Sequence, residues 1–183
     1  MKENEYTLYT TFDDLELKDE LLRGIYGYGL NKLSNVQQKG IYHITRNRDV
    51  IVQSQSGKCK NTTFSISILQ NIDININECQ GIVLAPTREL ASQIEKVMNR
   101  LGEYMGSRIH AFVGGRSTHE DIRVLNKGIH VVVGTPGRIS NMLQKGVLNL
   151  RNIKIFCLDD VDEMLTRGFR EQIHGIFHYL SEK

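Results

Sequence analysis

Short apolar runs alternate with amphipathic stretches along most of this chain. The runs have the length of buried strands, and they cover Asp49–Gln53, Gly81–Ala85, Ile109–Val113, His130–Val133 and Ile153–Leu158. The amphipathic stretches have the length of helices, and they cover Asn61–Asn71, Arg88–Leu101, Thr118–Leu125, Pro136–Leu143 and Phe169–Leu180. Strands that alternate with helices predict an α/β fold, with a doubly wound parallel sheet and helices on both faces.

Several predicted helices carry local start signals. Ser117 with Glu120 and Ser34 with Gln37 each have the spacing of a capping box. Thr135 followed by Pro136 predicts an N-cap and a proline at the first helical position. These signals support the helix assignments independently of the apolar pattern.

The composition of the chain excludes fewer possible functions than the pattern of apolar and polar positions does. A chain of 183 residues is long enough for one α/β domain with a core of its own. Its 23 Lys and Arg nearly balance its 21 Asp and Glu, so any surface for nucleic acid must be local. The three cysteines are far apart and have neither zinc-ligand nor disulfide-framework spacing, which favours a reducing compartment.

The sequence indicates no membrane contact. It has no apolar window of about 18 residues, and residues 1–10 are polar and acidic, unlike a signal peptide. We therefore expect a nuclear or cytoplasmic protein.

Candidate functional segments directly follow the apolar runs. In open parallel sheets, ligands bind outside the carboxyl ends of the strands, so these segments are expected to meet at one edge. They are Ser54–Asn61, Pro86–Ala91, Gly114–Gly115, Thr135–Arg138 and Asp159–Asp162.

The first of these segments partly matches a phosphate-binding loop. The pattern G-x-x-x-x-G-K-[ST] has glycines that turn backbone N–H groups toward phosphates, and a final hydroxyl for Mg²⁺. Ser54, Cys59 and Asn61 replace three of its fixed residues. Lys60 has two interpretations here: a phosphate contact, or a solvated lysine at a helix start.

Taken in order, these five segments resemble the first RecA-like domain of DEAD-box RNA helicases. The resemblance begins at Phe12, includes a segment similar to the family's Q motif at 29–37, and covers nearly the whole chain. It implies an N-terminal extension at 1–11 and a RecA-like ATP-binding domain at 12–183. Residues 22–29 and 168–173 resemble the eukaryotic translation initiation factor 4A branch, whereas 54–57, 64–70 and 120–123 lean toward its exon-junction paralogue.

The resemblance implies an ATP site with Mg²⁺. Lys60 would reach the phosphates, Asp159 would hold Mg²⁺ through water, and Asp160 stands where the family's glutamate orients or deprotonates the attacking water. Asp159 has an alternative interpretation as a helix N-cap. The residues implied to contact the cofactor are Phe12, Gln37, Ser54, Gln55, Ser56, Gly57, Lys58, Cys59, Lys60 and Asn61.

Two of these residues would recognise the adenine. By resemblance, Phe12 stacks on the base and Gln37 reads its edge, since an amide both donates and accepts hydrogen bonds. Gln37 has the alternative role of closing the capping box with Ser34.

Three departures from the family pattern fall in the ATP site. If Cys59 requires a positive φ, its side chain costs on the order of 1–2 kcal/mol and also crowds the phosphate. Asn61 offers Mg²⁺ an amide oxygen in place of a hydroxyl, and Lys58 adds a compensating positive charge. The carboxylate of Asp160 sits about 1 Å back from that of a glutamate, a shift that can cost roughly 100-fold in rate.

The remaining motifs resemble those that contact RNA in the family. Glycine N–H groups, helix N-termini and two arginines would follow the phosphate backbone without reading bases. A simple alternative is a set of helix starts with a basic residue in the first turn. The implied RNA-contacting residues are Pro86, Thr87, Arg88, Gly114, Gly115, Thr135, Pro136, Gly137 and Arg138.

The sequence therefore predicts the N-terminal domain of an ATP-dependent RNA helicase. Its expected partners are single-stranded RNA, a second RecA-like domain, and proteins of translation initiation or of the exon junction. Because Cys59, Asn61 and Asp160 all fall in the ATP site, a second hypothesis is an RNA-binding or scaffold module without ATP turnover.

Overall fold

The computed structural model describes residues 9–54, 57–115 and 117–181. Four parallel strands form its sheet, in the order β2-β3-β1-β4. The strands are β1 (Gly81–Leu84), β2 (Ile109–Phe112), β3 (Val131–Gly134) and β4 (Ile155–Leu158). The pairing is in register, with Leu84 opposite Gly134 on one side and opposite Leu158 on the other.

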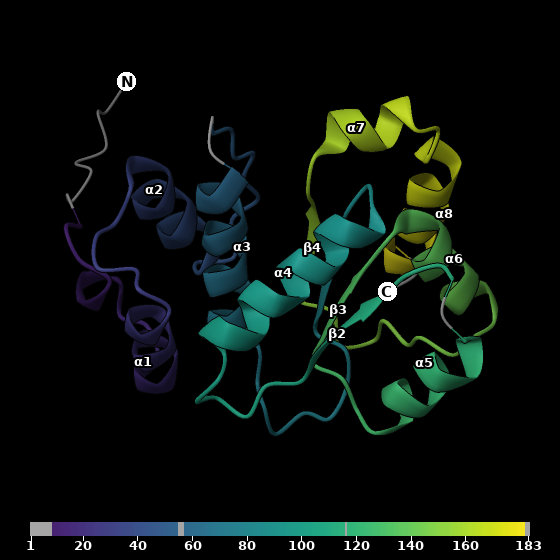
Figure 1. Ribbon diagram of the computed structural model, residues 1–183, viewed down its shortest axis with the longest axis horizontal. Coiled ribbons are helices and arrows are strands. Elements are labelled where there is room, and N and C mark those ends of the chain that lie inside the picture. The colour runs from purple at the N-terminus through teal and green to yellow at the C-terminus, as the bar shows by residue number, and fades with distance from the viewer. Residues whose placement is uncertain (1–8, 55–56, 116, 182–183) are drawn as a thin grey trace.

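Helices cover both faces of this sheet (Figure 1). The helices α1 to α4 form one side, and α5, α6 and α8 lie toward the other. Their bounds are α1 (Asp19–Gly27), α2 (Asn35–Ile44), α3 (Gly57–Asn71), α4 (Arg88–Leu101), α5 (Thr118–Asn126), α6 (Pro136–Gln144), α7 (Val161–Thr166) and α8 (Arg170–Ser181), and a short 3₁₀ turn (Asp13–Leu15) precedes α1. The predicted doubly wound parallel fold is thus confirmed.

Two hydrophobic cores lie on opposite faces of the sheet. Successive strand side chains point to opposite faces, so Val83 joins the core under α3 and α4, whereas Ile82 and Leu84 join the core under α6 and α8. Every residue of β1 and β3 is buried, which explains why both strands are continuous apolar runs. The residues of edge strand β4 are only partly buried.

The contact between α1 and α4 depends on a glycine. A Cβ built on Gly24 would lie 1.9 Å from the backbone oxygen of Leu101, so only glycine allows the two helices to approach so closely. Gly27, one turn later in α1, has no such neighbour, since its nearest atom would be 3.9 Å away.

The predicted strand at Asp49–Gln53 is wrong. These residues have no regular structure, and Ile51 is fully exposed. A segment becomes a strand only by pairing its backbone with a neighbour, and here a cavity of about 1080 Å³ is lined by this segment together with β4. The other four predicted strands are present, with ends that differ by one or two residues.

The helix-start signals have mixed outcomes. Ser34 and Gln37 form the complete predicted capping box of α2. Thr135 is the N-cap of α6 with Pro136 at its start, although Thr135 makes no side-chain cap hydrogen bond. The capping box predicted at Ser117 is wrong, because the Ser117 side chain makes no cap hydrogen bond.

None of the helices within the described residues is long and apolar enough to cross a bilayer.

Candidate functional site

The predicted segments meet along one edge of the sheet. Each strand runs directly into a loop and a helix start: β1 into α4, β2 into α5, β3 into α6 and β4 into α7. Because the strands are parallel, all four helix starts follow carboxyl ends and share one edge (Figure 1). The first turn of α3 joins this edge through a contact between Lys60 and Asp159.

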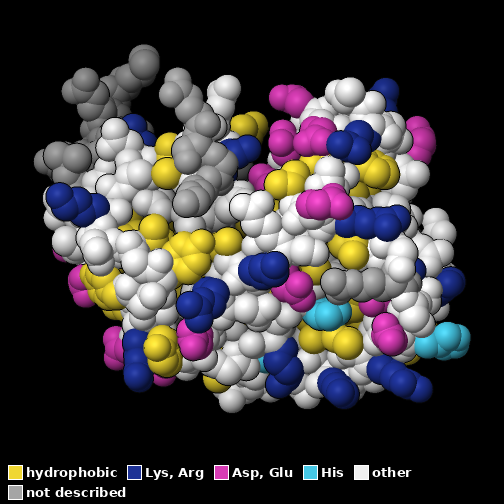
Figure 2. Space-filling model, viewed as in Figure 1, with side chains coloured by type: hydrophobic (Ala, Val, Ile, Leu, Met, Phe, Trp, Pro, Cys, Tyr) yellow, Lys and Arg dark blue, Asp and Glu magenta, His cyan; other side chains and the backbone are white. Residues whose placement is uncertain are grey.

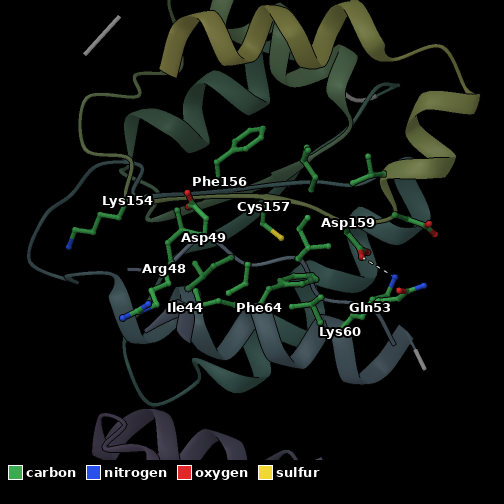
Figure 3. A pocket seen from close by; sticks show the side chains of 18 of the residues that line it. Ile44, Arg48, Asp49, Gln53, Lys60, Phe64, Lys154, Phe156, Cys157 and Asp159 are labelled. Carbon is green, nitrogen blue, oxygen red and sulfur yellow. Dashed lines mark ion pairs between the residues drawn. The ribbon is translucent and has the colours of Figure 1, made fainter. Parts of the chain in front are cut away.

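Lys60 and Asp159 form the centre of the predicted ATP site (Figure 3). Lys60 Nζ lies 3.8 Å from Asp159 Oδ1, across the space between α3 and the end of β4. The Lys60 side chain is a quarter exposed, whereas that of Asp159 is almost buried. The structure therefore favours the phosphate-site interpretation of Lys60 over a solvated lysine, since its ammonium faces a buried carboxylate.

Burial raises the pKa of Asp159 above its ordinary value. The Lys60 ammonium acts in the opposite direction, and the neighbouring charge of Asp160 raises the pKa further. Asp159 is also not a helix N-cap, because Asp160 occupies the N-cap of α7. A carboxylate whose ionised form is disfavoured by burial, with Lys60 beside it, is suited to a further cation.

The start of α3 corrects one expectation about Cys59. Cys59 lies in the first turn of the helix, and its φ is not positive. It therefore carries no left-handed strain, and only the predicted crowding of a phosphate remains. Asn61, two residues later in α3, is buried. The predicted contacts of Gln55 and Ser56 lie outside the described residues, and Ser54 precedes them as a half-buried residue that lines the large cavity.

Asp160 has an unusual backbone. Its φ and ψ are 56° and 58°, in the left-handed region that non-glycine residues seldom adopt. The side chain is exposed and makes no cap hydrogen bond to α7. Backbone conformations of this kind gather at functional sites, and the exposed Asp160 lies two residues after the end of β4.

In this structure, both residues predicted to recognise adenine make contacts within the protein. Gln37 accepts a hydrogen bond from Ser34 N–H at 2.9 Å and donates to Thr62 Oγ1 at 2.9 Å. Its amide thus closes the capping box and ties α2 to α3, so its alternative role is confirmed. Phe12 is fully buried, with Tyr26 at its edge. A buried ring has no face for a base, so stacking by Phe12 requires a conformation in which this ring is uncovered.

Arg88, Gly114 and Gly115 lie together at the next part of the edge. A Cβ on Gly115 would lie 2.5 Å from Arg88 Nη1, and Gly115 has a φ of 85°. The positive φ of this turn favours glycine at 115, whereas the Arg88 guanidinium, at the end of a flexible side chain, could move aside for a Cβ. The exposed Arg88 lines a shallow cavity of about 580 Å³ with residues that the sequence analysis missed, namely Ser92, Gln93 and Lys96.

Two of the missed residues, Ser92 and Lys96, had a detectable signal. Arg88, Ser92 and Lys96 are spaced four residues apart on α4, which puts them on one helix face. Figure 2 shows Lys and Arg side chains over α4, with acidic side chains among them. The basic surface is thus local, as the balanced composition requires.

The other predicted RNA contacts differ in exposure. Thr87 caps α4 by accepting a hydrogen bond from Leu90 N–H, and Pro86 and Pro136 are buried. Gly114 offers its backbone N–H group in a turn and Gly137 in the first turn of α6, and Thr135 precedes that helix. Arg138, in contrast, lies in a buried ion pair with Asp121, so its predicted phosphate contact is not supported in this conformation.

The donor set fits a magnesium nucleotide better than a metal bound by protein alone. Among the described residues, no three His, Cys, Asp or Glu side chains gather as ligands. Asp159 is a lone buried carboxylate next to a lysine, which suits Mg²⁺, because that ion keeps several waters and takes one or two carboxylates together with phosphates.

Sequence comparison agrees with this geometry. The family described as DEAD/DEAH box helicase matches residues 34–183, which is most of the chain. The chain belongs to this family. It is 55% identical over 175 residues to eukaryotic initiation factor 4A of Drosophila melanogaster, covering 96% of this chain and 43% of that protein. Eukaryotic initiation factor 4A-1 of Arabidopsis thaliana is 53% identical over 176 residues, with the same coverage.

Solved DEAD-box structures share the fold. A DEAD box protein from Methanococcus jannaschii superposes with a TM-score of 0.88 at 34% identity, over 93% of this chain and 47% of that one. Dbp5 of S. cerevisiae bound to RNA and ADP BeF3 gives a TM-score of 0.85 at 33% identity, over 93% and 44%. The DEAD-box chain described here thus spans less than half the length of these relatives. The two initiation factor 4A relatives support that branch of the family, and the lean toward the exon-junction paralogue stays a prediction.

Proposed function

We propose that this DEAD-box domain binds ATP with Mg²⁺ and single-stranded RNA along one edge of its sheet. It would serve as the N-terminal domain of an ATP-dependent RNA helicase of the initiation factor 4A type. The observation that carries the proposal is the Lys60–Asp159 pair, which sets a cation and a buried carboxylate beside a helix start.

The nucleotide would lie with its phosphates toward this pair. Lys60 would hold the β- and γ-phosphates, and the N–H groups at the start of α3 would add a favourable helix dipole. Asp159 and Asn61 would hold Mg²⁺, which when bound neutralises charge on the phosphates. Lys60 would then exchange part of its contact with Asp159 for the phosphates.

RNA would follow the neighbouring part of the edge. Arg88 is exposed above the Gly114–Gly115 turn, and the starts of α4 and α6 point N–H groups the same way. Such contacts read the phosphate backbone rather than the bases. The Dbp5 structure with RNA and ADP BeF3 shows that a relative of this fold binds both ligands.

The proposal also concerns the larger protein and the cellular process in which this domain would act. Hydrolysis in this family would require a second RecA-like domain to close over the nucleotide, so this domain alone should turn over ATP poorly. The initiation factor 4A relatives support a place in translation initiation or mRNA processing, in the cytoplasm or nucleus, with partner proteins of those processes.

A second function is favoured by three residues of the site. Cys59, Asn61 and Asp160 depart from the family pattern where phosphate, metal and attacking water would lie. The fold and Arg88 do not depend on these residues. The alternative is therefore an RNA-binding or scaffold module that has lost ATP turnover.

Thermal melting in the presence of ligand tests the proposal. Ligand at 100 times its Kd should stabilise the domain by about 2.7 kcal/mol. We expect ADP with Mg²⁺ to raise the Tm, ADP with EDTA to raise it less, and poly-U to raise it independently of nucleotide. A response to poly-U without any response to millimolar ADP and Mg²⁺ would support the scaffold function instead.

A further inference from the structure

Arg138 points into the protein and not along the RNA edge. Its Nε and Nη2 donate hydrogen bonds to Asp121 Oδ2 at 2.8 and 2.5 Å, and its Nη1 donates to Thr118 Oγ1 at 3.1 Å. The Arg138 side chain is 12% exposed and that of Asp121 only 3%. All three guanidinium nitrogens therefore have partners on one neighbouring helix.

These bonds connect the two helix starts that carry the RNA motifs. Thr118 and Asp121 lie in the first turn of α5, just after the Gly114–Gly115 turn, and Arg138 lies in the first turn of α6. Neither helix has a side-chain cap hydrogen bond at its start. The ion pair connects the two helix starts directly and so fixes their relative position.

The pair is too deeply buried to be exchanged for a phosphate. If Arg138 turned outward to RNA, Asp121 would keep a carboxylate in the interior with no positive charge against it, which is strongly unfavourable. Arg88 bears no such constraint, because its guanidinium is at the surface over Gly115.

We propose that Arg138 and Asp121 are positioning residues for RNA binding and that Arg138 makes no phosphate contact of its own. The pair holds the start of α5, just after the Gly114–Gly115 turn, and the start of α6 in fixed positions relative to each other. Arg88 supplies the charge. This inference rests on the proposed binding of single-stranded RNA at this edge.

The salt dependence of poly-U affinity separates a positioning arginine from a contacting one. Each phosphate contact to a single strand contributes about 0.7 to the slope of log affinity against log salt. Arg88→Ala should therefore lower the slope by about 0.7. Arg138→Met combined with Asp121→Leu replaces the buried pair by apolar groups, a change that proteins often tolerate. We expect this double variant to keep the slope of the unaltered chain, and a slope lower by about 0.7 would overturn the inference.

Arg138→Lys provides a second test, which does not depend on the double variant folding. Lysine keeps the charge but cannot make the same planar set of bonds to Asp121 and Thr118. We expect poly-U affinity to fall at least fivefold with the slope unchanged, whereas unchanged affinity would contradict a positioning role. If the unaltered, folded chain does not bind poly-U at all, the proposed function fails, and that outcome is distinct from a changed slope.

Discussion

Lys60 Nζ and Asp159 Oδ1 lie 3.8 Å apart, and the two side chains come from segments almost a hundred residues apart in the sequence. The distance is longer than that of a tight ion pair, and Asp159 remains mostly buried. The pair therefore leaves the Asp159 carboxylate incompletely neutralised. Such a site gains by taking in Mg²⁺ and phosphate together, which connects the geometry to the proposed function.

Cys59→Gly should strengthen ADP binding and weaken the nucleotide-free fold. Removing the side chain relieves the predicted crowding of the phosphate, whereas glycine in a helix costs roughly 0.5–1 kcal/mol. Melting with and without ADP and Mg²⁺ measures both effects. Cys59→Ala is the matched control, because it removes only the sulfur: equal gains in both variants would assign the crowding to Sγ, and no gain in either would refute crowding.

Turnover should be limited by three residues together. When the domain is joined to a competent second RecA-like half, Asp160→Glu alone should recover little RNA-stimulated ATPase activity. The triple change Cys59→Gly, Asn61→Thr and Asp160→Glu should recover several orders of magnitude, non-additively, because groups that act as a unit behave in this way. A steady-state ATPase assay checks this, and a typical family rate in the unaltered chain would end the scaffold hypothesis.

Gly24→Ala should destabilise the domain through the α1–α4 contact. The new Cβ would meet the Leu101 carbonyl, and overpacking of this kind costs roughly 1–3 kcal/mol or more. Gly27→Ala in the same helix has room, so it should be neutral or stabilising by up to about 1 kcal/mol. Urea denaturation of the two variants measures the difference, and similar losses would contradict the close approach.

His130 should make the fold sensitive to acid. It is fully buried, its Nδ1 accepts a hydrogen bond from Arg108 N–H at 3.0 Å, and burial followed by the Arg108 charge lowers its pKa. Because the folded pKa is lowered, the unfolded chain takes up the proton first. The stability contribution is therefore complete above the ordinary value near 6.5 and is lost as pH falls through the folded pKa.

His130→Asn should reduce this loss, since asparagine can still accept from Arg108 N–H without titrating. The Tm of the unaltered chain should fall more steeply below about pH 6.5 than that of the variant. His119→Asn, at an exposed position, is the control. Parallel curves for all three proteins would show that His130 is not the group responsible.

The fold was predictable because its central strands β1 and β3 are buried on both faces and because several of its helices have clear starts. The continuous apolar runs that identified β1 and β3 reflect the complete burial of these strands in the sheet. The segment at Asp49–Gln53 has the same apolar pattern, but pattern alone does not supply the backbone partner that a strand needs. Likewise, Ser117 with Glu120 has capping-box spacing, yet the first turn of α5 is held by Asp121 and Arg138 instead.

The site was predictable in position and less so in the direction of its side chains. The rule that motifs follow strand ends places Asp159 and Arg88 at one edge, whereas Lys60 reaches that edge from the start of α3 although the strand predicted before it is absent. The direction of Arg138 depends on a carboxylate 17 residues earlier, on another helix, and the burial of Phe12 depends on the packing of α1. Such contacts between distant segments have no local sequence signal.

The affinity of ADP with Mg²⁺ for three proteins tests the central claim most directly. Titration calorimetry should detect binding to the unaltered chain, and Lys60→Met should weaken it at least tenfold. Lys127→Met, at an exposed position beyond the far end of α5, should leave it unchanged. Equal affinity in the Lys60→Met protein and the unaltered chain would contradict the assignment of the phosphate site to the Lys60–Asp159 pair.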